Sequence, residues 1–270
     1  YFKSYRYKIL DIINITAGAL VGFIVGLTGV GGGSLMTPIL VLGYGINPAV
    51  AVGTDLIYAA ITKCTGIAFH HRHKTIDWRV VKYLLTGSIP SSLATIAYFS
   101  VYQEHQRAME GMIMGTLSLM LILTAILVLF KNKIAARGDQ AVGRNLRTHL
   151  RHKRPAITTV CGVLLGIVVT LSSVGAGAIG TAILFILHPK KSAIKIVGTD
   201  IAHAVPLTLI AGAGHMHLGS VDFSLLSGLL VGGVPAVYAG SFFGKKLSDK
   251  VLRPTIALIL FLMGLKLAFA

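Results

Sequence analysis

Apolar residues run along the chain in blocks of about twenty, and short polar stretches separate one block from the next. Six blocks predict uninterrupted helical spans, at residues 48–69, 79–101, 109–130, 192–213, 224–244 and 251–269. A helix of ~20 apolar residues crosses the hydrocarbon core of a bilayer, and no block alternates in the manner of a barrel strand. The pattern therefore predicts an all-α polytopic membrane protein.

Two further apolar stretches, residues 9–43 and 155–187, are interrupted by glycine. The first contains GVGGG at 29–33, and a glycine cluster of this kind disfavours a continuous helix. Each stretch predicts a re-entrant or discontinuous hairpin with arms of ~15 residues, or ~22 Å, which is short of the ~30 Å hydrocarbon core. Close helix packing is the alternative use of glycine, and it suits GALVG at 18–22 and GSIPSS at 87–92.

The second half of the sequence repeats the first at an offset of 144–145 residues. TGVGGGSLMTPILVL is echoed by SSVGAGAIGTAILFI, VGTDLIYAAIT by VGTDIAHAVPL, and TIDW by SVDF, always in the same order. This duplication predicts a first membrane repeat at 1–130, a basic cytoplasmic connector at 131–154 and a second membrane repeat at 155–270.

The number of membrane crossings sets the relative orientation of the two repeats. If each broken stretch enters and leaves on one side, each half crosses three times, so that the second repeat is inverted relative to the first. This arrangement collects most Lys and Arg on the side of the connector, as the positive-inside rule requires, and separates them better than a parallel arrangement does. We therefore expect two inverted repeats in the lipid bilayer of the cytoplasmic (inner) membrane.

Composition agrees with this class. Of the 270 residues, 54% are hydrophobic and only 13% are charged, and the mean hydropathy is +0.77. The formal net charge of +16 does not predict a nucleic-acid partner, because the basic residues cluster in the gaps between apolar blocks. Cys64 and Cys161 stand singly in apolar blocks and are expected to pack in the core without forming a disulfide.

The two glycine interruptions predict a binding site. Irregular backbone at membrane depth is tolerated only where protein or a water-filled cavity covers it, and inverted repeats bring two such breaks together. A helix that starts at a break directs unpaired N–H groups and partial positive charge at its ligand, which favours an anion. The predicted substrate contacts at the breaks are Gly31, Gly32, Gly33, Ser34, Gly175, Gly177 and Ala178.

Asp55 and Asp200 occupy matching places in the two VGTD blocks, a few residues into their spans. Ionisable groups inside a membrane are costly and mark pathways or coupling sites, so both carboxyl groups are candidate proton carriers. Thr54 and Thr199 are candidate hydroxyl donors to the substrate. Capping of a helix start by Asp or Thr is the alternative for both blocks.

Two more polar residues lie within apolar blocks. Lys63, eight residues after Asp55, is the candidate cation for an anionic substrate, and a structural ion pair with Asp55 or Asp200 is its alternative. His203, one turn after Asp200, is a candidate proton shuttle, and a packed neutral imidazole is its alternative. The sequence has no Walker, HExxH or GxSxG motif, so we expect no enzyme activity, no cofactor and no metal site.

The blocks GLTGVGGGSLMTPIL, VGTDLIYAAITK and KTIDWR resemble the TauE/SafE family of membrane permeases, also called the sulfite exporter family, over almost the whole chain. The resemblance implies two related helical halves and the movement, usually outward, of sulfur oxyanions and organosulfonates such as sulfite and sulfoacetate. Many family members have serine after GT, where this chain has Asp55 and Asp200.

The expected function is secondary transport of a small anion, by alternating access at the interface between the two repeats. An anion channel that uses the same glycine breaks is one alternative. A cation-coupled carrier that uses Asp55 and Asp200 is another. The sequence leaves open whether the protein forms a homodimer.

Overall fold

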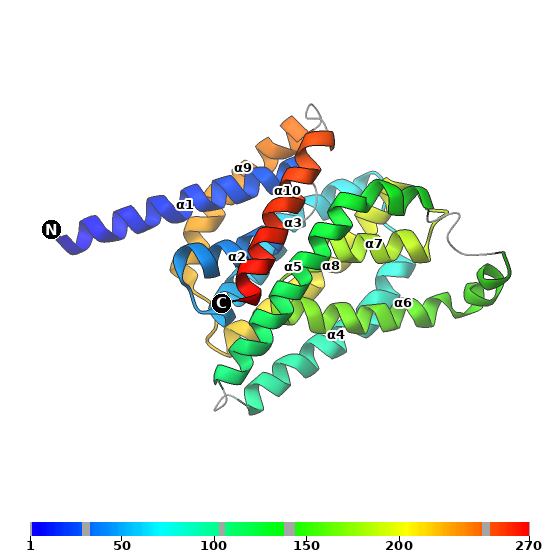
Figure 1. Ribbon diagram of the computed structural model, residues 1–270, viewed down its shortest axis with the longest axis horizontal. Coiled ribbons are helices and arrows are strands. Elements are labelled where there is room, and N and C mark those ends of the chain that lie inside the picture. Colours follow the sequence, from blue (N-terminus) through cyan, green and yellow to red (C-terminus); the bar gives the residue numbers. More distant parts are fainter. Residues whose placement is uncertain (1, 29–32, 103–105, 138–143, 245–248, 270) are drawn as a thin grey trace.

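The computed structural model describes residues 2–28, 33–102, 106–137, 144–244 and 249–269, and every regular element in these segments is a helix (Figure 1). The first half of the chain forms α1 (Phe2–Thr28), α2 (Gly33–Tyr44), α3 (Pro48–Arg72), α4 (Trp78–Val101) and α5 (Gln106–Arg137). The second half forms α6 (Arg144–Ser172), α7 (Ala178–Leu187), α8 (Ala193–His217), α9 (Phe223–Gly244) and α10 (Asp249–Ala268).

Within the described residues, six helices are long and apolar enough to cross a membrane; they lie in α3, α4, α5, α6, α8 and α9. The predicted class of polytopic helical membrane protein is confirmed. α3 begins at Pro48, because proline suits the first helical turn. α4 begins at Trp78, because the preceding Asp77 caps it by accepting the N–H groups of Arg79 and Val80.

The two glycine-broken stretches have unequal arms, so the prediction of two arms of ~15 residues was wrong. The first arms are long, with 27 residues in α1 and 29 in α6, whereas α2 has 12 residues and α7 has 10. The first arms are long because each helix continues through the polar sequence before its apolar run; α6 begins at Arg144, inside the predicted connector at 131–154. In Figure 1, α1 enters from the left, α6 enters from the right, and α2 and α7 lie between them.

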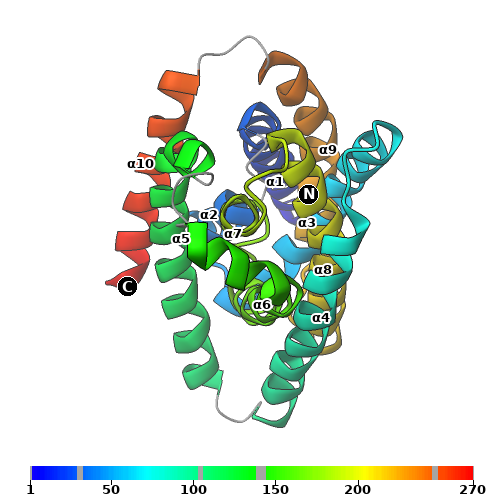
Figure 2. The same cartoon turned by 90° about the vertical axis from the view of Figure 1, so that its right-hand side faces the viewer.

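The two halves exchange helices in a symmetric way. α1 packs along α9 and α6 packs along α4, so the first helix of each half lies against the fourth helix of the other half. α3 packs against its counterpart α8, and α5 packs against its counterpart α10. Figure 2 shows α2 and α7 in the interior, between the α5–α10 pair and the group that includes α3 and α8. The halves therefore form one interleaved bundle.

Glycine allows the exchanged helices to approach closely. A Cβ atom at Gly22 of α1 would lie 2.5 Å from the Gly233 carbonyl oxygen of α9, and one at Gly87 of α4 would overlap the Thr159 carbonyl oxygen of α6. Backbone therefore contacts backbone in both pairs, as small-xxx-small patterns allow in membranes. The close-packing interpretation of GALVG and GSIPSS is confirmed.

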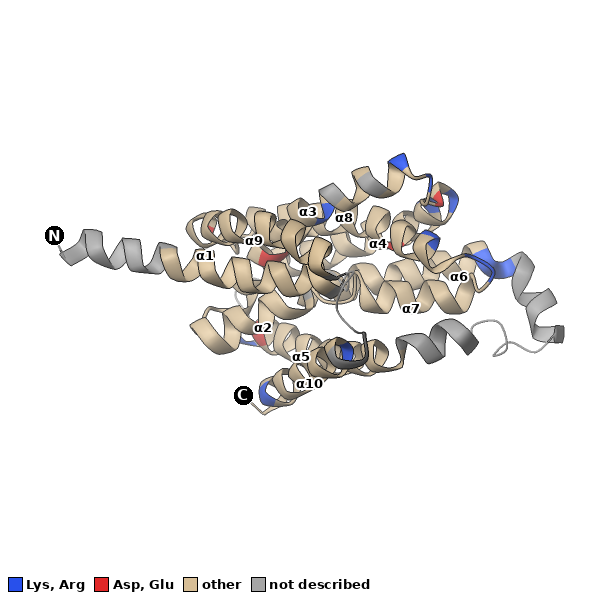
Figure 3. Cartoon of the chain, turned by 90° about the horizontal axis from the view of Figure 1, so that it is seen from above, with Lys and Arg blue, Asp and Glu red and all other residues tan. Residues whose placement is uncertain are grey.

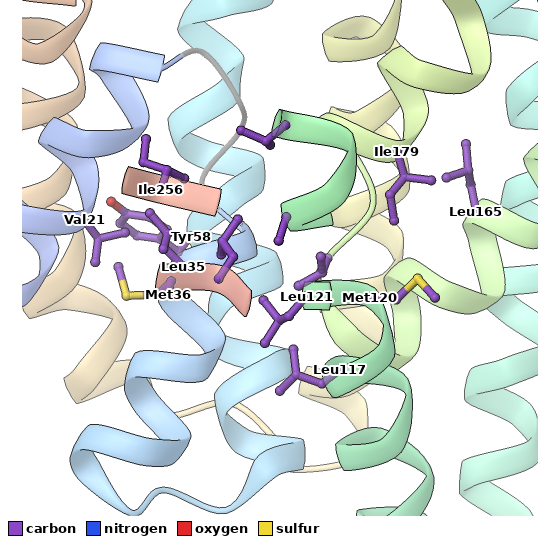
Figure 4. Close-up of a cluster of buried hydrophobic side chains, with 14 of the residues drawn as sticks. Val21, Leu35, Met36, Tyr58, Leu117, Met120, Leu121, Leu165, Ile179 and Ile256 are labelled. Atoms are coloured by element: carbon purple, nitrogen blue, oxygen red, sulfur yellow. The ribbon is translucent and has the colours of Figure 1, made fainter. Parts of the chain in front are cut away.

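The largest buried apolar cluster surrounds the short helices. Figure 4 shows Met36 of α2 near Val21 and Tyr58, and Ile179 of α7 opposite Leu165. α2 contacts the longer helices α3, α5 and α10, and α7 contacts α5, α6 and α8. The irregular backbone before α7, at residues 173–177, is buried or half-buried, as irregular backbone at membrane depth requires.

The outer faces of the long helices carry exposed apolar side chains, as a surface in contact with lipid requires. The described Lys and Arg residues lie mostly near helix ends (Figure 3). Cys64 is exposed on α3, so the prediction that it packs in the core was wrong; Cys161 of α6 is half-buried, and both thiols are free.

We predict that Gly22→Val destabilises the bundle, because the valine side chain pushes α1 away from α9. The expected cost is about 1–3 kcal/mol, seen as a lower melting temperature in detergent. Gly111→Val on α5 is the matched control, because a Cβ there meets nothing within 4 Å. Equal melting temperatures for the two variants would contradict the close contact.

Candidate functional site

The second glycine break, between α6 and α7, has a backbone that favours glycine. The φ angle is +122° at Gly175 and +141° at Gly177. The Gly180 N–H donates to the Gly175 carbonyl and the Thr181 N–H donates to the Gly177 carbonyl, which closes the first turn of α7. Gly177 is the N-cap and has no side chain to bind the N–H groups of that turn. The predicted contact Ala178 is the first residue of α7, so this helix start carries no side-chain cap.

The first glycine break falls outside the described residues, together with the predicted contacts Gly31 and Gly32. Gly33 is the first residue of α2. Ser34 is buried in the first turn of that helix, next to the break. Of the two predicted breaks, only the second is therefore described as a complete element.

Asp55 of α3 binds the short helix that follows the first break. The Thr37 N–H and the Thr37 hydroxyl both donate to Asp55 Oδ2, at 3.2 and 2.5 Å. Asp55 is fully buried, and Ser173 of the second break lies close enough to interact with it. Within the described residues, neither Asp55 Oδ1 nor Ser173 Oγ makes a hydrogen bond of acceptable geometry. Asp55 thus joins α3 to α2 and lies beside the second break.

Lys63 of α3 reaches the second break directly. Its Nζ donates to the Ala176 carbonyl at 2.9 Å. The side chain is buried, and its ammonium group lies within electrostatic reach of both Asp200 and Asp55. A residue of the first half therefore places a positive charge at the irregular backbone of the second half.

A partly open pocket of about 150 Å³ lies beside Lys63. Its wall comes from α1, α3, α7, α8 and α9, so both halves of the chain line it. A cavity of this size holds a ligand of about six non-hydrogen atoms. The wall includes Gly177 of the second break. The residues with polar side chains in the wall are Thr62, Lys63, Thr181, Asp200 and Ser241.

The two aspartates of the VGTD blocks have different surroundings. Asp200 lines the pocket, whereas Asp55 does not and is bound by Thr37. Asp200 also lies against α7, where a Cβ atom at Gly180 would overlap its Oδ1. The residue that matches Gly180 in the first repeat is Met36, and there the Asp55 carboxylate contacts the next residue of the short helix, Thr37.

Thr54 and Thr199 hold the opposite half of the chain and do not line the pocket. The Asp222 N–H at the start of α9 donates to Thr54 Oγ1 at 3.1 Å. The Asp77 N–H at the start of α4 donates to Thr199 Oγ1 at 3.0 Å. Each threonine therefore joins its own repeat to a helix start of the other repeat, and we call these two contacts the clasps.

An ion pair between Asp77 and Lys191 reinforces one clasp. Lys191 lies between α7 and α8, and its pKa is lowered by partial burial and by the nearby Lys195. The matching linker of the first repeat, residues 45–47, contains no basic residue, so the clasp at Asp222 has no equivalent ion pair there. The two ends of the bundle are therefore closed unequally.

His203 is buried on α8, one turn after Asp200, and does not line the pocket. Its Nε2 lies 2.9 Å from Ser88 Oγ of α4. Within the described residues, no group of three or more His, Cys, Asp or Glu side chains is placed to hold a metal ion.

Four residues near the site were not predicted from the sequence, and all lie on the short helices or at the second break: Thr37, Ala176, Gly180 and Thr181. The repeat in the sequence could have identified two of these four residues. Thr37 and Thr181 occupy the same position in the repeated glycine block, which makes them a pair like Asp55 and Asp200. The role of the Ala176 carbonyl had no signal, because a backbone contact does not depend on the side chain.

Comparison with known proteins places this arrangement in a family. Residues 14–267 match the family described as sulfite exporter TauE/SafE. The probable membrane transporter protein YjnA of Bacillus subtilis is 40% identical, over 96% of this chain and 100% of its own length. The probable membrane transporter protein YdhB of Bacillus subtilis is 28% identical, over 93% of this chain and 97% of its own length. The probable membrane transporter protein MJ0441 of Methanocaldococcus jannaschii is 28% identical, over 97% of this chain and 97% of its own length. No solved structure matches the chain significantly.

We predict that Thr37→Val destabilises the protein, because it removes the hydroxyl that binds the buried Asp55 carboxylate. The expected cost is about 1–3 kcal/mol in thermal unfolding. Thr124→Val is the control, because Thr124 is equally buried and its hydroxyl has no hydrogen-bond partner among the described residues. A Thr124→Val variant that melts as low as Thr37→Val would refute the assigned contact.

Proposed function

The chain belongs to the sulfite exporter TauE/SafE family and is a membrane transporter, and on this basis we propose that it is a secondary transporter of a small anion. The proposed substrates are sulfur oxyanions and organosulfonates such as sulfite and sulfoacetate. Export across the cytoplasmic (inner) membrane is the proposed direction.

The observation that carries the proposal is the position of Lys63. Lys63 lines a pocket shared by both halves, and its ammonium group donates to the irregular backbone before α7. Gly177, the N-cap of α7, and Thr181 of the same helix line this pocket, and the start of α7 has no side-chain cap. A buried cation and a helix N-terminus together favour an anionic ligand of a few non-hydrogen atoms.

The charges around the pocket support coupling to protons. Lys63, Asp55 and Asp200 carry a net charge of −1 when all three are ionised. Adding an anion to this group in a low-dielectric interior is costly, and the cost falls when a carboxylate takes up a proton. We propose that Asp200, which faces the pocket, binds a proton together with the substrate, and that Asp55 and His203 assist it.

The interleaved halves support alternating access. The pocket wall contains helices from both halves, and one clasp lies at the start of α4 and the other at the start of α9. Rocking of one half against the other would open one clasp while the other stays closed. The opposite directions from which α1 and α6 enter the bundle are those expected of inverted repeats (Figure 1).

We predict that the purified protein is stabilised by its substrate and that Lys63→Met loses this effect. Thermal unfolding is measured with sulfite, sulfoacetate, taurine, sulfate and chloride, because a ligand that binds the folded form raises the melting temperature. Lys82→Met is the matched control, because Lys82 is exposed on α4 and lies outside the pocket. Equal stabilisation of Lys63→Met and Lys82→Met would show that Lys63 does not bind the anion.

Flux measurements separate the proposal from its alternatives. In proteoliposomes, a carrier accumulates labelled substrate against its gradient when a proton gradient is imposed, whereas an anion channel only equilibrates it. Dependence on Na⁺ in place of the proton gradient would favour the cation-coupled alternative.

We predict that Asp200→Asn removes the pH dependence of transport. The wild-type flux should fall as the pH rises, because the protonated carboxyl that accompanies the anion becomes rarer. Asparagine is neutral at every pH, so exchange by the variant should continue while accumulation driven by a proton gradient is lost. Flux through Asp200→Asn that still falls with rising pH would contradict the assigned coupling role.

A further inference from the structure

Between α4, α6 and α8, the membrane interior contains a line of polar side chains that the proposed transport cycle does not use. All of them are at most 1% exposed, and none lines the pocket. They are Ser88 and Ser92 of α4, Thr170 of α6, and His203 and His215 of α8.

The members of the line contact one another in pairs. His203 Nε2 lies 2.9 Å from Ser88 Oγ, and Ser92 Oγ lies 2.7 Å from Thr170 Oγ1. Ser88 and Ser92 are one helical turn apart on the same face of α4. His215 Nε2 lies 2.9 Å from the Thr170 carbonyl oxygen. The line therefore extends from the turn of α8 that carries Asp200 to the last turn of α8.

Both imidazole rings keep an unpartnered nitrogen. A carbonyl oxygen only accepts, so His215 Nε2 carries a proton in the contact with Thr170. Within the described residues, His215 Nδ1 and His203 Nδ1 have no hydrogen-bond partner, although both rings are buried. A buried polar atom without a partner is costly, and ordered water is the usual means of satisfying it.

The fold does not require these hydroxyl groups. At the matching positions of the other repeat, His203 is replaced by Tyr58, Ser88 by Gly233, Ser92 by Val237 and Thr170 by Gly26. There the Tyr58 ring lies directly against Gly233, and α1 and α9 pack closely. Gly26 and Val237 line the pocket, so the site of the polar line in one half corresponds to the site of the pocket in the other.

We propose that this polar line is the route by which protons reach Asp200, a proposal that rests on the proton-coupled transport proposed above. A proton enters near His215, moves along the hydroxyl groups of Thr170, Ser92 and Ser88, and passes through His203 to the Asp200 carboxylate. Each hydroxyl accepts one proton and releases another, so no net charge stays on the line, and rotation of the O–H groups prepares the line for the next transfer. In this proposal, water bridges the three steps at which the side chains do not touch: from His215 to the Thr170 hydroxyl, from Ser92 to Ser88, and from His203 to Asp200.

The groups that face the two rings come from the helices packed against α8. His203 is faced by Lys63 of α3 and by Ser88 of α4. His215 is faced by Thr170 of α6, by Phe99 of α4 and by Gly53 of α3. α7, which also packs on α8, has no titratable side chain. Lys63 is thus the charged group that acts on His203 from a neighbouring helix.

The test is the number of protons taken up for each substrate molecule, measured in proteoliposomes that contain a pH-sensitive dye. Thr170→Val keeps the shape of the side chain and removes its hydroxyl, whereas Thr170→Ser keeps the hydroxyl and removes a methyl group. We expect the proton-to-substrate ratio to fall by at least about tenfold in Thr170→Val and Ser92→Ala, and to stay at the wild-type value in Thr170→Ser.

Two control variants lose a hydroxyl outside the line. Ser91→Ala removes a hydrogen bond to the Val163 carbonyl between the same two helices, and Thr208→Val removes a hydroxyl that binds carbonyl groups of its own helix. Both should keep the wild-type ratio. Should Thr170→Val fail to fold, Ser92→Ala against Ser91→Ala gives the same comparison.

The outcomes separate the route from the transporter. A wild-type ratio in both Thr170→Val and Ser92→Ala overturns the route, and so does an equal loss in Thr170→Val and Thr170→Ser, which marks a packing role. Substrate flux without proton uptake in the wild type overturns the route but leaves the transporter. Absence of flux for all anions tested overturns the proposed function, and the route with it.

Discussion

The structure depends on one constraint: inside a membrane, each polar backbone or side-chain group must be covered by protein or by enclosed water. The second glycine break exposes carbonyl and N–H groups that a continuous helix would satisfy. Lys63 covers the Ala176 carbonyl, Ser173 lies beside Asp55, and the longer helices α5, α6 and α8 pack against α7. The interior position of the break and the pocket beside it both follow from this requirement.

The VGTD block serves the same constraint in two directions. Its threonine accepts an N–H group at a helix start of the opposite half, and its aspartate turns inward to the short helix of its own half. Adjacent residues of α3 and of α8 therefore connect the end of the bundle with its centre. In the proposed alternating access, a movement that opens a clasp would be transmitted through the backbone to the carboxylate one residue away.

The repeat in the sequence gives two equivalent helix contacts, α1 with α9 and α6 with α4, and their side chains differ. Small residues on α1 and α9 leave the pocket beside Lys63 and Asp200, whereas Ser92 and Thr170 fill the matching place between α4 and α6. Lys63 itself is matched by Thr208, so only one of the two places contains a buried cation. The difference between the two helix contacts comes from a few residues that differ between the repeats. It separates the proposed path of the substrate from the proposed path of the proton.

The sequence by itself determined the membrane class, the duplication and the starts of α3 and α4, because hydrophobic length, repeated blocks and caps are local properties. It also marked Asp55, Lys63, Asp200 and His203, because ionisable residues stand out in apolar blocks. Only the tertiary structure decided how they differ. Asp200 faces the pocket, whereas Asp55 binds Thr37. Thr54 and Thr199 form the clasps. These contacts join helices that are distant in the sequence, and no local pattern encodes the relative placement of such helices.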